Sequence, residues 1–504
     1  MRSFRDAIDI HAAARSDAPL LLAPEPDAVV SYGELQHSAR SLGAYLAGQG
    51  VAPGSVVSFM LPNGVSAASV FLGAMYAGYV VSPINLIAQD AQIAYVLAHS
   101  GTRFIFAAPE FISRLERLCG EARCAAVLHP TDPDHLDLPS SDAGDLAAVD
   151  GTTSAMLMYT SGTTGNPKGV LLSHWNMIYA GRAVAEAHAL STRDRVLSSL
   201  PLYHINGQCI ATVGPLVSGG GIVMPHRFSA SQWWPLVERY EPTWLNMVPT
   251  IIAYLLAGPE PTAAQARACR GVRFGRVASA PLPPAQHHAF EARFGISIIE
   301  AMGLTESASI AFANPLEAGE RRYGSAGRPL GVEARVVASD GAVLGAHAAG
   351  EIELRGESVM LGYYRAPELT AQALSPDGWL ATGDLGYRDA DGFYFITGRL
   401  KELIIKGGEN IAPREIDEAL LKHPAVLEAA AVGIPDELYG QDILACVVLK
   451  PGASCDVTEL RAHCQAQLGR YKTPRELRFV AALPKGPSGK VQRLKLLDMQ
   501  GPSA

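Results

Sequence analysis

The chain of 504 residues has no long apolar run and no recognisable export signal. Its longest apolar stretches, such as VVSFMLP and MLMYT, fall well short of the ~20 residues that span a bilayer. The first residues, MRSFRDAIDIHAAARSDAP, mix acids with bases and lack the apolar core of a signal peptide. The sequence therefore predicts neither a transmembrane segment nor secretion.

Cysteine and net charge are also low. The seven cysteines are scattered, odd in number and without a C-x-x-C pair, which favours a reduced, cytoplasmic setting. The formal net charge of -8 is small for this length and argues against a nucleic-acid partner. With 48% hydrophobic and 18% charged residues, the composition is that of a globular protein with several lobes.

The sequence pattern predicts an α/β protein. Strand-length apolar runs alternate with helical stretches up to about residue 300, as in SVVSFML, SAASVFLGAMYAG, YVVSPIN, DAQIAYVLAHSG and TRFIFAA. This alternation predicts parallel-type sheets covered by helices. Short strands punctuated by Gly and Asp from about 325 to 398 predict a smaller antiparallel sheet lobe. Another change after residue 400 predicts a small α+β domain, so we expect domains at 1–400 and 401–504.

A loop rich in glycine and hydroxyl groups stands out at residues 159–169, YTSGTTGNPKG. It follows the apolar run SAMLM and precedes a second strand and a helix whose expected N-cap is Ser173. Glycine lets backbone N–H groups approach an anion, and hydroxyls and one lysine add donors and charge. The loop is not a Walker A sequence, and composition alone leaves a surface turn open.

Four further motifs decide between these readings: EAMGLTES (300–307), WLATGDLG (379–386), GRLKELIIKGGEN (398–410) and PSGKVQR (487–493). In this order, and with the loop, they resemble the adenylate-forming (AMP-binding) superfamily, which includes acyl-CoA synthetases, adenylation domains and luciferases. The resemblance implies that ATP and a carboxylic acid give an acyl-adenylate and pyrophosphate, after which coenzyme A displaces AMP. It also implies Mg²⁺ as cofactor and a mobile C-terminal domain, and leaves a homodimer open.

The resemblance also assigns residues to the nucleotide. It implies ATP contacts at Thr160, Ser161, Gly162, Thr163, Thr164, Gly165, Lys168, Ser279, Ala280, Pro281, Met302, Gly303, Asp384 and Arg399. Asp384 corresponds to the carboxylate that accepts from the ribose hydroxyls. Met302 stands where the family usually has an aromatic residue against adenine, and we expect its polarizable thioether to cover the ring instead.

Catalytic roles are implied for Lys490, Thr305, Glu306 and His204. Lys490 corresponds to the lysine that bridges the substrate carboxylate and the α-phosphate, Glu306 to the Mg²⁺ ligand, and His204 to a gate beside the thiol tunnel. Lys401 occupies the hinge position, and Gly407 and Gly408 belong to the loop that the coenzyme A arm passes.

The acid itself is the least determined feature. The expected acyl pocket includes Asn206, Gln208, Met247 and Val248, which are mixed in polarity and include no evident cation for a second carboxylate. The segment HINGQC is similar to fatty-acid-type ligases, so we expect an aliphatic, medium- to long-chain acid. An aryl- or small-acid ligase, or an enzyme that loads a carrier-protein thiol, stays open.

A nucleotide-binding protein without catalytic activity is disfavoured because Glu306 and Lys490 are both present. The pairs His287–His288 and Trp233–Trp234 match no motif and are expected to be structural.

Overall fold

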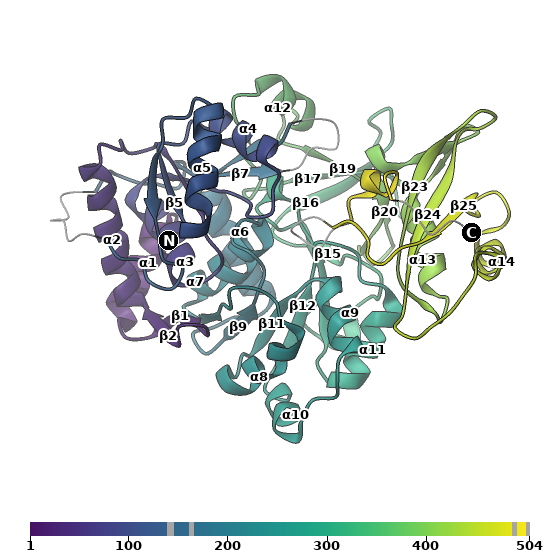
Figure 1. Ribbon diagram of the computed structural model, residues 1–504, viewed down its shortest axis with the longest axis horizontal. Helices are drawn as coiled ribbons and strands as arrows, with labels where there is room; N and C mark the ends of the chain where they lie inside the picture. Colours follow the sequence, from purple (N-terminus) through teal and green to yellow (C-terminus); the bar gives the residue numbers. More distant parts are fainter. Residues whose placement is uncertain (139–145, 161–165, 486–490, 500–504) are drawn as a thin grey trace.

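The computed structural model describes residues 1–138, 146–160, 166–485 and 491–499. It has an α/β fold with a large N-terminal region and a smaller C-terminal part, which lies at the right of Figure 1. This confirms the fold class predicted from the sequence. Within the described ranges, no helix is both long and apolar enough to cross a membrane.

A seven-stranded sheet carries the glycine-rich loop. Its order is β18-β8-β7-β4-β3-β5-β6, formed by Gly362–Tyr363, Lys168–Ser173, Ser154–Thr160, Val80–Pro83, Val56–Met60, Phe104–Ala107 and Val127–Pro130. The strands from β7 to β6 pair in parallel, as expected, and β8 returns antiparallel to β7. The short connection between β7 and β8 explains this exception, because a parallel return needs a long crossover.

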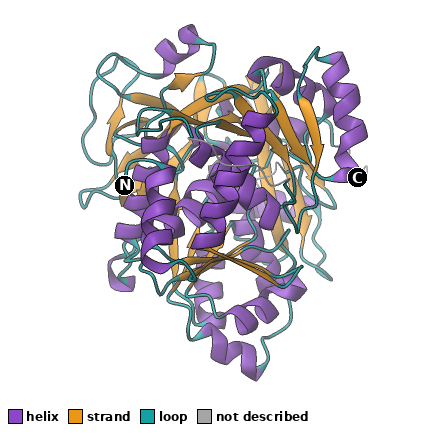
Figure 2. Ribbon diagram, turned by 90° about the vertical axis from the view of Figure 1, so that its left-hand side faces the viewer, coloured by secondary structure: helices purple, strands orange, loops and turns teal. Residues whose placement is uncertain are grey.

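A nine-stranded sheet lies beside it, in the order β15-β14-β13-β12-β11-β9-β10-β1-β2. These strands are Arg328–Pro329, Phe312–Ala313, Ile298–Met302, Phe274–Val277, Trp244–Met247, Arg195–Ser198, Gly221–Val223, Pro19–Ala23 and Ala28–Ser31. The strands from β13 to β1 pair in parallel. Figure 2 shows helices both between and outside the strands.

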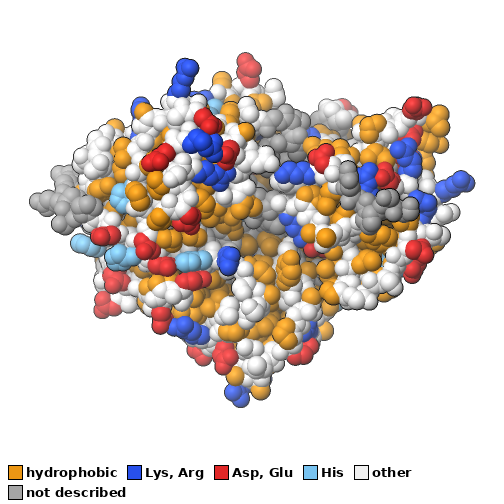
Figure 3. All heavy atoms as spheres, in the orientation of Figure 1, with side chains coloured by type: hydrophobic (Ala, Val, Ile, Leu, Met, Phe, Trp, Pro, Cys, Tyr) orange, Lys and Arg blue, Asp and Glu red, His pale blue; other side chains and the backbone are white. Residues whose placement is uncertain are grey.

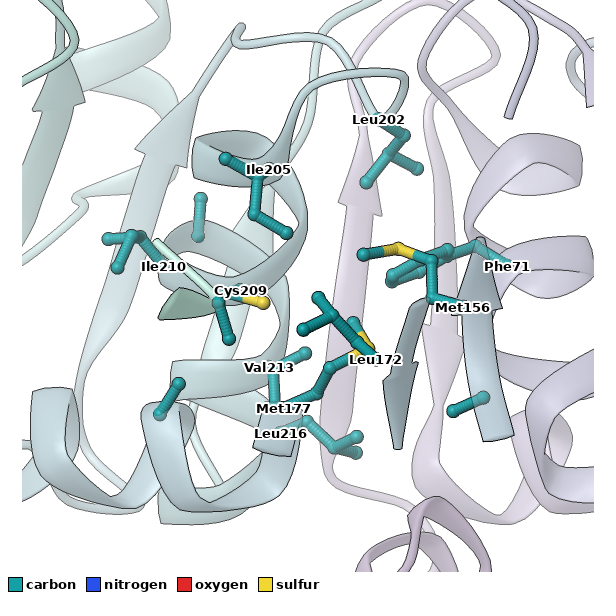
Figure 4. Packing of buried hydrophobic residues seen from close by; sticks show 14 of the residues in the cluster. Phe71, Met156, Leu172, Met177, Leu202, Ile205, Cys209, Ile210, Val213 and Leu216 are labelled. Atoms are coloured by element: carbon teal, nitrogen blue, oxygen red, sulfur yellow. The ribbon is translucent and has the colours of Figure 1, made fainter. Parts of the chain in front are cut away.

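Helices cover the sheets on both faces. Those with strongest bearing on the site are α3 (Val65–Ala77), α6 (His174–Ala187) and the π-helix η1 (Asn206–Val213). Ser173 is the N-cap of α6 and forms a capping box with Asn176, which confirms the predicted cap. Side chains from these helices, from β7 and from β8 meet in the largest hydrophobic cluster, part of which is drawn in Figure 4.

A second cluster lies on the other face of the nine-stranded sheet, under α8 (Ala230–Tyr240), α9 (Pro249–Ala257), α10 (Ala263–Cys269) and α11 (Pro284–Phe294). Trp233 and Trp234 are buried in it, as expected of structural residues. His287 is buried as well, whereas His288 is exposed.

The predicted antiparallel lobe is the four-stranded sheet β16-β17-β19-β20, formed by Glu333–Val337, Gly350–Arg355, Leu380–Arg388 and Tyr394–Arg399. The short helix η4 (Leu400–Glu402) follows β20 and contains Lys401, which is exposed. The order of strands and helices after it is β21 (Ile404–Lys406), β22 (Glu409–Ile411), α13 (Pro413–Leu421), β23 (Val426–Asp436), β24 (Gly440–Leu449), α14 (Val457–Leu468) and β25 (Glu476–Phe479). These elements form a separate sheet with hydrophobic clusters of its own.

Candidate active site

The β7–β8 hairpin presents the ends of the glycine-rich loop. Thr160 and Lys168 are register partners, so the loop between them starts and ends at one point of the sheet. The predicted ATP contacts Ser161, Gly162, Thr163, Thr164 and Gly165 lie outside the described residues. The Lys168 Nζ is 4.8 Å from the ring centroid of Tyr363, which belongs to β18 and is brought beside β8 by strand pairing.

Tyr363 links the loop lysine to the predicted metal ligand. Its hydroxyl donates a hydrogen bond of 3.0 Å to Oε1 of Glu306. Burial and the charge of Glu306 raise the pKa of Tyr363, which keeps the phenol protonated as a donor. Tyr363 was not identified from the sequence, because no motif includes it and its partners lie more than fifty positions away.

Thr305 and Glu306 lie together in the short helix η2 (Thr305–Ser307). Thr305 is buried, whereas Glu306 is only partly buried. A hard oxygen donor with room for water beside it suits Mg²⁺, which keeps several waters and takes one or two carboxylates. The donor chemistry of Glu306 therefore fits the cofactor expected from the sequence.

Gly303 sets the shape of the turn between β13 and η2. A Cβ at this position would lie 2.0 Å from the backbone oxygen of Ser309, so no larger residue fits without a backbone shift. Met302, at the end of β13, is partly buried and pairs with Phe312 of β14. The absence of a side chain at 303 thus keeps Met302 and Thr305 on a tightly folded turn.

Asp384 and Arg399 face each other across β19 and β20, where they are register partners. Arg399 Nε lies 2.7 Å from Asp384 Oδ1, and Nη2 donates to Oδ2 at 3.4 Å. Burial lowers the pKa of Arg399, but the carboxylates of Asp384 and Glu402 outweigh it, so the pKa is raised and the pair is ionic. The structure therefore brings together the two residues expected at the ribose.

A chain of amides lies at the carboxyl ends of β9, β11 and β12. Asn206 donates to the hydroxyl of Ser279 at 3.2 Å, and Asn246 donates to Asn206 Oδ1 at 3.1 Å. Ser279 has a φ of 75°, an unusual backbone conformation for a residue with a side chain. Asn246 was missed because the residues of WLNMVPT that were expected in the acyl pocket were its neighbours Met247 and Val248.

The other predicted acyl-pocket and gate residues are divided between two places. Gln208 is buried in η1 and donates to the Leu202 carbonyl at 2.6 Å. His204 Nδ1 accepts from the backbone N–H of Asn206 at 3.3 Å. Met247 and Val248 instead pack in the cluster under α9. Side chains alternate along β11, so Met247 faces away from Asn246 and its partner Asn206, and Val248 follows the strand as the N-cap of α9.

Ala280 and Pro281 follow Ser279 and lead away from β12. The side chain of Ala280 is half-buried and that of Pro281 is exposed.

Gly407 and Gly408 form the turn between β21 and β22 with φ values of 54° and 86°. A Cβ at 407 would lie 2.7 Å from the Tyr471 hydroxyl, so this turn has close contact with a neighbouring side chain. Lys490 lies outside the described residues. Lys485 and Val491, which precede and follow the undescribed segment 486–490, pair in an isolated bridge.

Arg276 is a buried cation that was not recognised from the sequence. It lies in the middle of β12, is 0% exposed, and none of its guanidinium nitrogens has a hydrogen-bond partner among the described residues. Burial lowers the pKa of Arg276 to about 9, which still leaves it charged at neutral pH. Its strand neighbour in register is Asn246. The segment RFGRV gave no warning, because an isolated arginine in a strand is ordinarily a surface residue.

The α/β fold, with its smaller C-terminal part, is that of an adenylate-forming ligase. The chain belongs to the AMP-binding enzyme family: residues 8–364 match the AMP-binding enzyme model, and residues 415–490 match the AMP-binding enzyme C-terminal domain. It is an AMP-forming acid–thiol ligase that uses ATP and coenzyme A by way of an acyl-adenylate.

Individual relatives give more detail. A sulfoacetate–CoA ligase of Cupriavidus necator is 54% identical over 496 residues, covering 97% of this chain and 96% of that protein. An oxalate–CoA ligase of Arabidopsis thaliana is 32% identical and covers 88% of each chain. The crystal structure of ATP-bound MatB from Rhodopseudomonas palustris has a TM-score of 0.88 at 28% identity, covering 97% of this chain and 98% of that one. The similarity to a ligase for sulfoacetate does not support the expected medium- to long-chain acid.

Proposed function

We propose that the protein converts a small carboxylic acid with a second anionic group, of which sulfoacetate is the leading candidate, to its coenzyme A thioester. The single observation that carries this choice is the 54% identity to a sulfoacetate–CoA ligase along nearly the whole chain. The amide and hydroxyl groups of Asn206, Asn246 and Ser279 support it, because a polar wall suits a short polar acid better than a long alkyl chain.

In the first step the acid carboxylate attacks the α-phosphorus of ATP, the acyl-adenylate forms, and pyrophosphate leaves. The loop ended by Thr160 and Lys168 would hold the departing phosphates, with Lys168 supplying positive charge. Asp384 would accept from the ribose hydroxyls while its second role, the pair with Arg399, holds its orientation. Each contact acts by positioning and by charge, which are the main needs of phosphoryl chemistry.

Glu306 would hold Mg²⁺, and the hydrogen bond from Tyr363 to Oε1 orients the carboxylate for this. When bound, the ion would offset the negative charge of the triphosphate. Lys490 would bridge the acid carboxylate and the α-phosphate, two anions that otherwise repel each other.

In the second step the thiol of coenzyme A attacks the acyl carbon and AMP leaves. The small domain would rotate about Lys401 and bring the Gly407–Gly408 turn to the pantetheine arm. Both glycines have positive φ values and no side chain, which suits a backbone that the pantetheine arm must approach closely. His204 would separate the acyl pocket from the thiol path.

The proposal is tested by pyrophosphate release and thioester formation with an acid panel of sulfoacetate, oxalate, acetate, butyrate and decanoate. We expect sulfoacetate to have the highest kcat/KM, with AMP and pyrophosphate as the nucleotide products. Decanoate as the best substrate, or ADP as the product, would contradict the proposal.

The lysine assignment is tested in the same assay by comparing Lys490→Ala with Lys495→Ala. Lys495 is an exposed lysine of the same segment and serves as the matched control. We expect Lys490→Ala to lower acyl-adenylate formation by at least 100-fold while supplied acyl-adenylate still reacts with coenzyme A. Equal loss of both half-reactions would show that Lys490 is not specific to the first step.

A further inference from the structure

Arg276 lies on the same side of the nine-stranded sheet as the amide chain of the site. Side chains alternate along β12, and its neighbours two positions away, Phe274 and Ala278, belong to the large cluster that faces α6 and η1. In register beside it on β11 is Asn246, whose amide reaches Asn206. Arg276 thus lies on the same face of the sheet as Asn246, which is connected to Ser279 by hydrogen bonds through Asn206.

The Arg276 guanidinium is buried without a hydrogen-bond partner in the described part of the chain. Nε, Nη1 and Nη2 are all enclosed and have no hydrogen-bond partner among the described residues. Burial alone accounts for its lowered pKa, without an offsetting carboxylate. An unpaired buried charge is among the most unfavourable groups that a protein interior can hold, and such groups are normally paired.

Two polar side chains near Arg276 also have buried atoms without a hydrogen-bond partner among the described residues. Asn246 Oδ1 and both ring nitrogens of His188 are buried without a partner in the described part of the chain. His188 is the C-cap of α6, and burial together with the charge of Arg276 lowers its pKa to about 3, so it is a neutral ring. Neither side chain can supply the negative charge that Arg276 lacks.

We propose that Arg276 binds the second anionic group of the acid, a sulfonate or carboxylate, while the first carboxylate is presented to ATP. This rests on the proposed function and names the residue that gives that site its preference for dianionic acids. A planar guanidinium donates two parallel hydrogen bonds to such a group, which a point charge cannot do. Asn246, in register beside Arg276, donates to Asn206, and Asn206 donates to Ser279, so polar side chains connect the strand position of Arg276 with the segment that follows β12.

The same placement explains selection against acids with an apolar tail. A hydrocarbon beside Arg276 would leave the guanidinium buried and unpaired, whereas an anion satisfies it. Specificity of this kind depends on what the wrong ligand leaves unsatisfied.

The test compares sulfoacetate with methylsulfonylacetate, a neutral sulfone of similar shape that keeps the reactive carboxylate. Pyrophosphate release gives kcat/KM for both acids in the wild type, Arg276→Met and Arg276→Lys. Arg270→Met, at an exposed position after α10, is the matched control. We expect the wild-type ratio of sulfoacetate to sulfone to fall by at least 100-fold in Arg276→Met, as for loss of a buried charge partner.

Arg276→Lys keeps the charge but not the two-pronged geometry, so its ratio should fall by about tenfold. The Lys variant also decides the question if Arg276→Met does not fold. Arg270→Met should keep the wild-type ratio. A ratio within threefold of wild type in a folded Arg276 variant, or equal loss of both acids, would overturn the inference and leave the proposed function intact. A wild-type enzyme inactive on every acid of the panel would overturn both.

Discussion

Glu300 gives a prediction whose magnitude follows from the structure. It lies in β13 and is 4% exposed; Oε1 accepts from the Leu282 N–H at 3.1 Å, while Oε2 has no partner among the described residues. Burial raises the pKa of Glu300 from 4.5 to about 7, and the Leu282 hydrogen bond and the charge of Arg414 oppose this only in part.

The sign of the effect on stability follows from proton binding. Between pH 4.5 and 7 the folded protein holds a proton on Glu300 that the unfolded chain has lost, so stability falls as pH rises. At about 1.4 kcal/mol for each pKa unit, the ionised side chain costs about 3 kcal/mol above pH 7. Glu300→Gln removes the charge but keeps the acceptor for the Leu282 N–H.

We therefore expect Glu300→Gln to be more stable than the wild type by about 3 kcal/mol at pH 8 and nearly equal at pH 4.5. Urea unfolding followed by tryptophan fluorescence, from pH 4.5 to 8, measures the difference at each pH. Glu320→Gln, at an exposed position, is the control and should show no such slope. A difference that is constant with pH, or larger at low pH, would refute the reasoning.

Two further substitutions test the site. Gly303→Ala places a methyl group 2.0 Å from a backbone oxygen, so we expect it to lose about 1–3 kcal/mol of stability and most adenylation activity, whereas Gly319→Ala, with open space around it, changes neither. Thermal unfolding and pyrophosphate release measure both; equal behaviour of the two variants would contradict the tight turn. Asp384→Asn weakens both the proposed ribose contact and the Arg399 pair, so we expect the KM for ATP to rise at least tenfold with a smaller change for the acid. An unchanged KM for ATP would remove Asp384 from the nucleotide site.

Local signals carried the fold prediction. Strand and helix periodicity identified the elements from 55 to 107, and Ser173 was recognisable as a cap because its hydroxyl has a chemical task at a helix start. The antiparallel lobe was evident from short strands and frequent turn residues. Acidic and basic side chains intermix on the face shown in Figure 3.

Pairings between distant segments could not be predicted in this way. The two-residue strand β18 is too short to show a period, yet it places Tyr363 between Lys168 and Glu306. The contact from Asn246 to Asn206 depends on which face of β11 lies toward η1. The motifs supplied the expected site residues, whereas the side chains that contact them could be found only from the folded structure.

Arg276 shows why the substrate was the weakest expectation. A charged residue in a short strand is ordinarily expected at the surface, and the segments expected to line the pocket offered no evident cation for a second carboxylate. The folded chain instead buries that charge without a partner among the residues that the structure describes, at a cost that a well-packed apolar residue would avoid. A protein can retain such a destabilising charge when a ligand supplies its partner. Here the bound anion would pair with Arg276 and offset the unfavourable burial of the charge. On this argument, adding sulfoacetate should raise the unfolding temperature of the wild type more than that of Arg276→Met, and equal shifts would show that the buried charge has no part in binding.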